Sequence, residues 1–126
     1  MMDENRVGTA IVHCALTVHR NLGPGLLEST YTACLAYELL EAGLEVFIEH
    51  PLPVIYKDVK LDCGYRLDLW VNRKVIIEIK AVKELDDVHL AQIITYLKLT
   101  NNKLGYLINF NVSRIKHGIK RVANGL

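Results

Sequence analysis

Apolar residues recur at helical spacing in two stretches of the first third of the chain. Between residues 5 and 20 they fall at every third or fourth position, and Gly23-Pro24-Gly25 follows as a stop. A second helix is predicted from about Leu26 to Ala42, ending at Gly43. Its buried stripe is expected to consist of Leu27, Tyr31, Cys34, Leu35 and Leu39.

After Gly43 the pattern changes to the two-residue alternation that is typical of strands. A strand is predicted over residues 45–50, and Pro51 and Pro53 then mark an edge or a bend. Two more strands are expected around the turn Lys57-Asp58, and a fourth strand follows a turn at residues 72–74. These three strands are placed at residues 53–56, 59–71 and 75–82.

The last third of the chain mixes a helix with further strands. Asp86 or Asp87 is expected to cap a helix that reaches about Leu99. The apolar segment Lys103–Phe110 predicts a strand, and residues 113–122 a last strand or short helix. The apolar stripe of the helix is expected at Leu90, Ile93, Ile94 and Leu97. The order indicates one domain, residues 1–126, of α/β or α+β class, with helices flanking a central sheet.

The composition is that of a soluble globular protein, with 51% apolar and 23% charged residues. Its apolar runs are all shorter than the roughly 20 residues that span a bilayer. The acidic start MMDENR differs from the basic start of a signal peptide. The three cysteines are widely spaced among apolar neighbours, which indicates buried thiols rather than a zinc site. A cytoplasmic protein that does not contact membranes is expected.

Charge is distributed unevenly along the chain. All fourteen acidic residues lie at or before Asp87, whereas six of the fifteen Lys and Arg residues follow it. An acid-free segment of this kind could face an anionic polymer, and the alternative is a solvated face that balances the acidic part. Charge alone does not choose between the two. The basic residues concerned are Arg114, Lys116, Lys120 and Arg121.

The two strands around residues 72–74 can be paired from their apolar pattern. Side chains alternate between the faces of a strand, so Leu67, Leu69 and Val71 share one face. The same holds for the alternating apolar residues of 75–79. Matching the two apolar faces requires Val71 opposite Val75, with a three-residue loop between them.

This register places Asp68 opposite Glu78 on the other face, with Lys80 beside them. Two opposed carboxylates repel unless a cation lies between them, and their hard oxygen ligands suit Mg²⁺ or Mn²⁺. Such an ion can polarise a phosphodiester and lower the pKa of a bound water. The alternative is a solvated face, because acid-x-lysine patterns are common on exposed strands. Motifs elsewhere in the chain weaken that alternative.

Four motifs together resemble a known family. Gly25-Leu-Leu-Glu28-Ser-Thr-Tyr31 matches the GxxExxY signature of a family of small bacterial proteins placed in the PD-(D/E)XK nuclease superfamily. Gly64-Tyr-Arg-Leu-Asp68 followed by Glu78-Ile-Lys80 is similar to the core motif of that superfamily, with Leu67 at its usual proline position. Gln92-Ile-Ile-Thr-Tyr96 resembles the QxxxY helix motif of RecB-like nucleases. The resemblance spans roughly residues 21–122 and implies a restriction-endonuclease-like α/β core with a central mixed sheet.

The resemblance implies a role for each matching residue. Asp68 and Glu78 would bind Mg²⁺ or Mn²⁺, together with the backbone carbonyl of Ile79. Lys80 would position the attacking water, and Glu28 would support the metal or its waters. Gln92 would orient the substrate or Lys80. The residues expected to contact nucleic acid are Tyr31, Arg66, Tyr96, Arg114, Lys116, Lys120 and Arg121.

The helical residues among these also have structural interpretations. Glu28 lies in the first turn of its helix, where the helix dipole favours an acid. Tyr31 could equally be a core residue. Gln92 and Tyr96 share a polar stripe that could face solvent. The role of Gln92 therefore rests mainly on the resemblance.

The leading hypothesis is a metal-dependent nuclease that hydrolyses DNA phosphodiester bonds by in-line attack of water, with RNA left open as a substrate. A second hypothesis is a dimeric, structure-selective endonuclease of the junction-resolvase kind. A domain this small offers little surface, and two sites related by a twofold axis would fit a duplex or branched target. The third is a non-catalytic nucleic-acid-binding or partner-docking module with the same fold, against which the intact acid, acid and lysine set argues.

Overall fold

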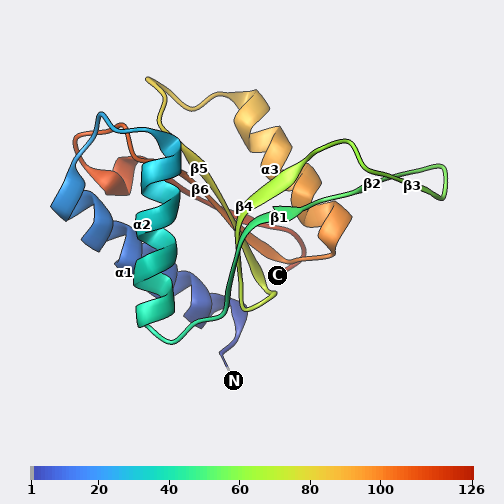
Figure 1. Ribbon diagram of the computed structural model, residues 1–126, viewed down its shortest axis with the longest axis horizontal. Coiled ribbons are helices and arrows are strands. Elements are labelled where there is room, and N and C mark those ends of the chain that lie inside the picture. The colour runs from blue at the N-terminus through green and yellow to red at the C-terminus, as the bar shows by residue number, and fades with distance from the viewer. Residues whose placement is uncertain (1) are drawn as a thin grey trace.

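A five-stranded mixed sheet lies between two helices on one face and a third helix on the other (Figure 1). The computed structural model describes residues 2–126. Its helices are α1 (Glu4–Leu22), α2 (Glu28–Glu41) and α3 (Asp87–Thr100), with a short 3₁₀ helix, η1 (Ile115–His117). Its strands are β1 (Val46–Pro51), β2 (Val54–Tyr56), β3 (Val59–Leu61), β4 (Arg66–Val71), β5 (Val75–Lys80), β6 (Leu104–Asn109) and β7 (Ile119–Ala123). The predicted α/β arrangement of helices around a central mixed sheet is confirmed.

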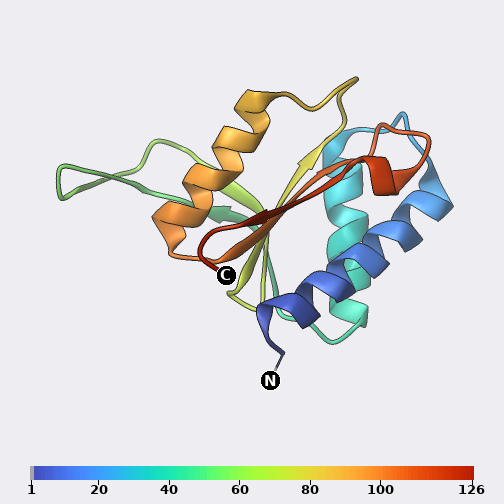
Figure 2. The same ribbon diagram turned by 180° about the vertical axis from the view of Figure 1, so that it is seen from behind.

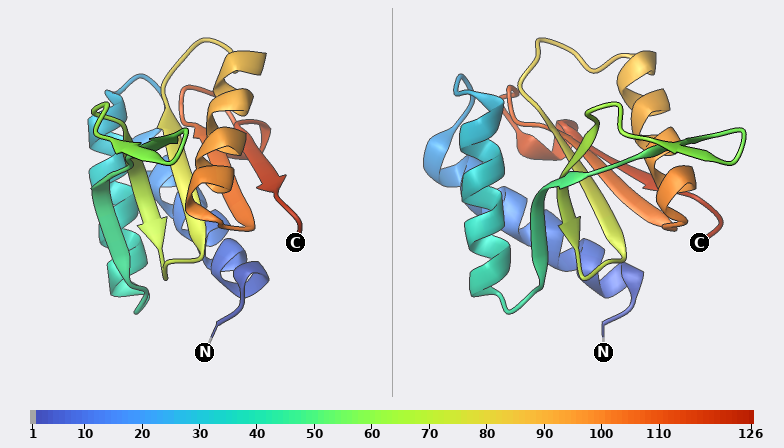
Figure 3. Two further views of the ribbon diagram at one scale, coloured as in Figure 1. Left: turned by 90° about the vertical axis from the view of Figure 1, so that its right-hand side faces the viewer. Right: turned by 45° about the vertical axis from the view of Figure 1, so that its right-hand side comes forward.

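The strand order in the sheet is β1-β4-β5-β6-β7. Strands β5 and β6 run parallel, whereas the other neighbouring pairs run antiparallel. Parallel neighbours need a long crossover, and α3 supplies it on the face opposite α1 and α2 (Figures 2 and 3). The carboxyl ends of β5 and β6 therefore lie at the same edge of the sheet, next to the start of α2 (Figure 1).

Apolar side chains fill both faces of the sheet. Ile11 of α1 and Leu35 of α2 are fully buried against Ile77 of β5. On the opposite face, Ile93 of α3 is fully buried in a cluster with Ile76 of β5. Covering a strand from both sides removes its apolar side chains from water and fixes its position. The carboxyl end of β5 thus projects from a packed core.

The two N-terminal helices form where the apolar spacing predicts them, and one of their expected core residues is wrong. Tyr31, Leu35 and Leu39 are fully buried, and Cys34 is half-buried. Leu27, however, is 73% exposed. It is the N-cap residue of α2, so it precedes the first turn and lies outside the helical phase of the buried stripe.

Helix α3 is capped by Asp86, as one of the two predicted alternatives, but its buried face differs from the expected stripe. The Asp86 carboxylate accepts hydrogen bonds from the backbone N–H groups of Val88 and His89. The buried residues are Ile93, Tyr96 and Leu97, whereas Leu90 is exposed and Ile94 is half-buried. Tyr96 can enter the buried face because its hydroxyl finds a partner in Gln92.

The predicted strand over residues 59–71 is interrupted in the structure. Strand β3 ends at Leu61 and β4 begins at Arg66, and Gly64 turns the chain between them with a φ of 78°. Strands β2 and β3 instead form a separate hairpin that projects away from the central sheet (Figures 1 and 3). In the C-terminal segment both predicted alternatives occur, since η1 is followed by β7.

The register predicted for β4 and β5 is confirmed. Val71 pairs with Val75, and residues 72–74 form the three-residue loop. Asn72 and Arg73 both have positive φ values, and the Asn72 side chain accepts a hydrogen bond from the backbone N–H of Glu45. The short loop and the Val71–Val75 pair set which residues of the two strands lie opposite each other, and so set the geometry of the acidic pair.

Candidate functional site

Strands β4 and β5 diverge at Asp68 and Glu78. Their ladder runs from Val71 and Val75 to the pair Leu69 and Ile77. At the next position, backbone N–H groups donate to side-chain carboxylates instead of to carbonyl groups of the neighbouring strand. The backbone N–H of Asp68 donates to Glu78 Oε2 at 3.0 Å, and the backbone N–H of Ile79 donates to Asp68 Oδ2 at 2.7 Å. Each acid is therefore held by the strand opposite, with its second carboxylate oxygen left over for another ligand.

Strand β1 also parts from β4 beside Asp68. The β1–β4 ladder pairs Ile48 with Leu69 and His50 with Leu67, and it passes over Glu49 and Asp68. Glu49 has a φ of 53°, an uncommon conformation for a residue other than glycine. Asp68 thus lies at a break in the pairing of β4 with both of its neighbours.

This break corrects the expectation that Leu67 shares a face with Leu69 and Val71. Leu69 and Val71 pack on the α1 and α2 side, but Leu67 packs with Ile76 on the α3 side. A regular strand would keep all three on one face. Because pairing is interrupted on both sides, β4 can twist at Asp68, so that Leu67 faces α3. The Asp68 carboxylate then reaches across to the backbone of β5.

The electrostatics of the pair follow from its burial. Glu78 is only 3% exposed, and burial followed by the charge of Asp68 raises its pKa from 4.5 to about 8. Burial also raises the pKa of Asp68, with smaller contributions from the charges of Glu49 and Glu28. The Ile79 N–H and Lys80 act in the opposite direction on Asp68 without cancelling the rise. The two carboxyl groups are thus held close together in a buried position, where it is unfavourable for both to be charged at once.

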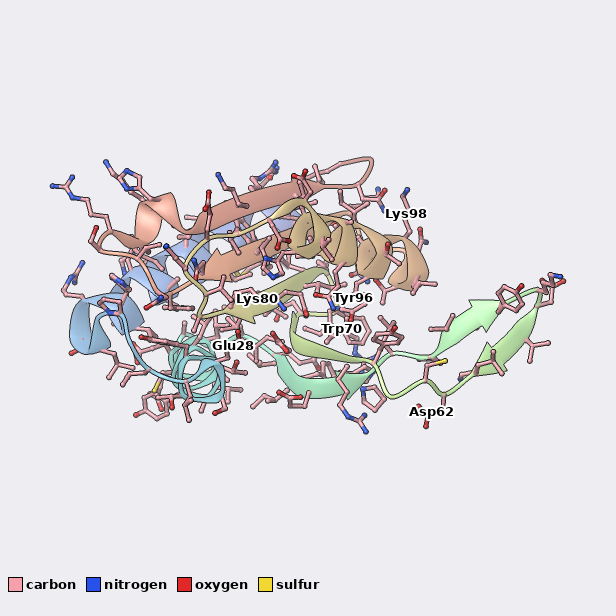
Figure 4. The ribbon with its side chains drawn as sticks, turned by 90° about the horizontal axis from the view of Figure 1, so that it is seen from above. Glu28, Asp62, Trp70, Lys80, Tyr96 and Lys98 are labelled. Carbon is pink, nitrogen blue, oxygen red and sulfur yellow. The ribbon has the colours of Figure 1, made fainter. Side chains whose placement is uncertain are left out.

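Glu28 and Lys80 reach the same edge of the sheet. Glu28 is the first residue of α2, and its Oε2 accepts a hydrogen bond from the backbone N–H of Ala81 at 3.1 Å. Lys80 is the last residue of β5 and is half-buried. Seen from above, Lys80 lies between Glu28 at the start of α2 and Tyr96 of α3 (Figure 4). Elements far apart in the sequence therefore bring these groups together.

Gln92 and Tyr96 form a small network on α3. The Gln92 amide donates to the Tyr96 hydroxyl at 3.0 Å, and the ring of Tyr65 lies edge-on to that of Tyr96 at 6.2 Å. Burial, and next the charge of Glu78, raise the pKa of Tyr96. The predicted QxxxY helix therefore lies within the electrostatic reach of the acidic pair.

The site offers oxygen ligands of the kind that a hard cation prefers, but too few of them for a complete coordination sphere. Within residues 2–126, no group of three or more His, Cys, Asp or Glu side chains is arranged to hold a metal ion. Asp68 and Glu78 nevertheless each keep one carboxylate oxygen free of the backbone bonds described above. Burial raises both pKa values, and the charge of Asp68 adds to the rise at Glu78. A divalent cation between the carboxylates would favour their charged forms. The residues present therefore fit Mg²⁺ or Mn²⁺ with water completing the ligand set.

The aromatic residues expected to contact nucleic acid are mostly buried. Tyr31 is fully buried, stacks on Phe110, and donates its hydroxyl hydrogen to the Gly23 carbonyl at 2.6 Å. This packing favours the alternative that Tyr31 is a core residue, because its side chain is fully buried and fixes the turn before α2. Tyr96 is also buried, whereas Arg66 is exposed at the start of β4.

The four basic residues of the C-terminal segment do not share one face. Lys120 pairs with Leu107, which pairs with Glu78, so the three lie in one row across the sheet. Arg121 points to the opposite face, where its guanidinium donates to Asn5 of α1 at 2.8 Å. Arg114 and Lys116 are exposed around η1. Only part of the basic segment is thus on the same face as the acidic pair.

Two residues near the site escaped the sequence interpretation. Glu49 was missed because it looks like an exposed residue of an alternating strand, and only the β1–β4 pairing brings it next to Asp68. Asn109 is 2% exposed, and its amide exchanges two hydrogen bonds with the backbone of Val82, just after Lys80. A polar residue in the apolar run of β6 was the available signal for Asn109.

The helices described here are too short or too polar to cross a membrane, as judged over residues 2–126. A sequence model of the PD-(D/E)XK nuclease superfamily matches residues 5–122. Comparison with curated proteins and with solved structures gave no significant match. The mixed sheet flanked by helices is consistent with the restriction-endonuclease-like fold of that superfamily. The chain therefore belongs to the PD-(D/E)XK nuclease superfamily.

Proposed function

We propose that this protein is a divalent-metal-dependent nuclease that hydrolyses phosphodiester bonds of DNA. Membership of the superfamily implies a nucleic-acid substrate. The observation that carries the proposal is the reciprocal arrangement of Asp68 and Glu78, which are held by each other's strand with raised pKa values. Holding two acids in this state is costly for a purely structural purpose and is a common feature of functional sites.

Asp68 and Glu78 would hold the metal, Mg²⁺ or Mn²⁺, with the backbone carbonyl of Ile79. When bound, this ion supplies Lewis-acid polarisation of the phosphate and a water of lowered pKa. Lys80 would orient the attacking water from the same face as Glu78, two residues further along β5. Glu28, held by the Ala81 N–H, would orient a second water from the start of α2.

Gln92 would contact the substrate or orient Lys80 from α3. Its amide donates to the Tyr96 hydroxyl, which keeps Gln92 near the site and leaves its carbonyl oxygen for other contacts. Arg66, Arg114, Lys116 and Lys120 are candidates for phosphate contacts, because all four are exposed. Tyr96 would act through Gln92 rather than through bases, because it is buried.

We also propose that the chain is a GxxExxY protein within the superfamily. The glycine of this motif, Gly25, has a φ of 101°, and Tyr31 bonds the backbone of Gly23 and Leu26 in the same turn. These contacts fix the turn that leads into α2, and Glu28 at its start accepts a hydrogen bond from Ala81, directly after β5. The three motif residues thus share one task, which supports assigning the motif as a unit.

The test is a panel of labelled single-stranded, duplex, flap and four-way DNA, with RNA of matched sequence, incubated with Mg²⁺ or Mn²⁺. We expect cleavage of at least one DNA substrate by the wild type, and its loss in Asp68→Asn and with a chelator. Cleavage that persists in Asp68→Asn would assign the activity to a contaminant. A wild type that binds these nucleic acids without cutting any would favour the non-catalytic alternative.

A further inference from the structure

The β2–β3 hairpin exposes an unusual amount of apolar surface for its size. Its strands project from the body of the protein (Figure 1), and residues 2–126 offer them no third strand. The large side chains are about half exposed, with Ile55 at 52%, Tyr56 at 59%, Val59 at 54% and Leu61 at 41%. A two-stranded hairpin is marginally stable by itself in water, and its open edges invite pairing.

The apolar surface continues from the hairpin onto α3. A groove of about 420 Å³ runs between the base of the hairpin and α3, and its lining includes Val54, Tyr65, Val88 and Leu99. Tyr65 is 48% exposed and Val88 is 74% exposed. A projecting apolar arm thus lies next to an apolar groove on the same molecule. We call the arm and groove together the hairpin surface.

The charge of the hairpin indicates which kind of partner it fits. Residues 54–64 contain two lysines, Lys57 and Lys60, and two aspartates, Asp58 and Asp62. A surface that binds a polyanion carries an excess of basic residues, which this segment lacks. In a twofold interface each patch faces a copy of itself, so it must carry both signs to avoid repulsion. The hairpin meets that condition.

The area is also sufficient. Strand pairing puts Tyr56, Val59 and Leu61 on the face of the hairpin that continues to Tyr65 and Val88. Large apolar and aromatic residues bury roughly 150–200 Å² each, so these five, which are between 41% and 74% exposed, offer on the order of 500 Å² per copy. Two copies would bury about 1,000 Å² before their polar rims are counted, which is near the lower limit for a specific interface. An exposed patch of this size usually has a binding function.

We propose that the β2–β3 hairpin is a homodimerisation arm. In a twofold dimer, each hairpin packs on the hairpin and α3 groove of the other copy, with Lys57 facing the partner's Asp58 at the turn. The proposal does not rest on nuclease activity, because dimerisation is tested by the molecular mass of the protein in solution. It gives a physical basis for pairing two sites, since the hairpin is joined to Asp68 through residues 62–67 and Tyr65 contacts Tyr96.

Sedimentation and light scattering of the whole protein test the proposal. We expect the wild type to have twice the 14.3 kDa mass of one chain at concentrations of roughly 100 µM, and Val59→Asp to be monomeric. Leu40→Asp is the matched control, because Leu40 is 52% exposed on α2 and should leave the dimer intact. A monomeric wild type, or a Val59→Asp variant that stays dimeric, overturns the proposal.

Charge reversal keeps the test valid if an apolar substitution unfolds the hairpin. One variant, Lys57→Asp with Lys60→Asp, leaves four acids on the arm, and the other, Asp58→Lys with Asp62→Lys, leaves four lysines. We expect each alone to be monomeric and an equimolar mixture to regain the dimer mass. A mixture that stays monomeric contradicts the pairing. If all hairpin variants keep the wild-type mass but bind DNA more weakly, the arm is a nucleic-acid contact and not a dimer interface.

Discussion

A buried carboxylate beside a second carboxylate can keep a proton or bind a cation, and Glu78 is in this position. Because the pKa of Glu78 is raised to about 8, this side chain keeps its proton at neutral pH when no metal is bound. A divalent ion would displace that proton, so the affinity for metal should increase with pH. The same acid therefore links folding stability, protonation and the proposed chemistry.

The metal-free protein should become less stable as the pH rises from about 5 to above 8. An acid whose pKa is higher in the folded state than in the unfolded state binds an extra proton on folding, and this stabilisation is lost as the pH passes through the folded value. The slope contributed by one such group is at most about 1.4 kcal/mol per pH unit. Urea unfolding with chelator present should show this slope in the wild type and a flatter one in Glu78→Gln.

Glu49→Gln provides the companion measurement. Removing the Glu49 charge removes one of the influences that raise the folded-state pKa of Glu78, so the fall in stability should end at lower pH than in the wild type. Glu41→Gln on α2 is the control, since it is exposed and belongs to a different part of the surface. If Glu78→Gln shows the same slope as the wild type, Glu78 is not the titrating group.

Asp68→Ala should abolish the binding of Mn²⁺ that calorimetry detects in the wild type. The substitution removes one of two side-chain carboxylates proposed as ligands and leaves the Ile79 N–H without its acceptor. Glu41→Ala is the matched control and should bind as the wild type does. Retained binding in Asp68→Ala would refute the metal assignment whatever the activity of the variant.

Lys80→Ala should keep the melting temperature and lose cleavage. The side chain ends at the half-exposed carboxyl end of β5, so its removal leaves no large cavity. A positioned electrostatic or proton-transfer group contributes a factor of roughly 10² or more to the rate, which sets the expected loss. Equal cleavage by variant and wild type, on any substrate that the wild type cuts, would exclude the proposed role.

At the scale of the elements, the end of β5 is fixed from β6. The Asn109 amide bonds both backbone groups of Val82, and the Phe110 N–H donates to the Lys80 carbonyl at 2.9 Å. Asn109→Ala leaves two backbone groups of Val82 without these partners. We expect a loss of about 2 kcal/mol in the free energy of unfolding, with reduced cleavage. Asn111→Ala is the control, because its bond to Val82 is long, at 3.4 Å.

The elements also show what the sequence can and cannot predict. The β4–β5 register was predictable because a three-residue loop and two apolar faces leave one solution, and Asp68 and Glu78 follow from it. Glu28 was identified through a motif rather than through geometry, since its contact with Ala81 spans 53 positions. Glu49 and the turning-over of Leu67 depend on the pairing of β1 with β4, which alternation within either strand does not specify.

On the scale of the whole molecule, the proposed site lies at the carboxyl end of β5, at the edge of the sheet that Glu28 of α2 also reaches. The expected basic face is divided there by the alternation of β7, which sends Lys120 toward the α3 side and Arg121 toward α1. The charge asymmetry of the chain thus becomes two separate surfaces in the fold. Substitutions on the two surfaces can tell a nucleic-acid contact from a solvated face.

Lys120→Gln should weaken DNA binding about equally for all sequences, whereas Arg121→Gln should leave it unchanged. Lys120 shares a row of the sheet with Glu78, while Arg121 is on the opposite face and bonds Asn5. A lost phosphate contact lowers the slope of log affinity against log salt by roughly 0.7–0.9. Filter binding at several salt concentrations, in Ca²⁺ to suppress cleavage, measures this slope. A quadruple variant with glutamine at Arg114, Lys116, Lys120 and Arg121 that matches the wild type in slope and affinity would show that substrate follows another path.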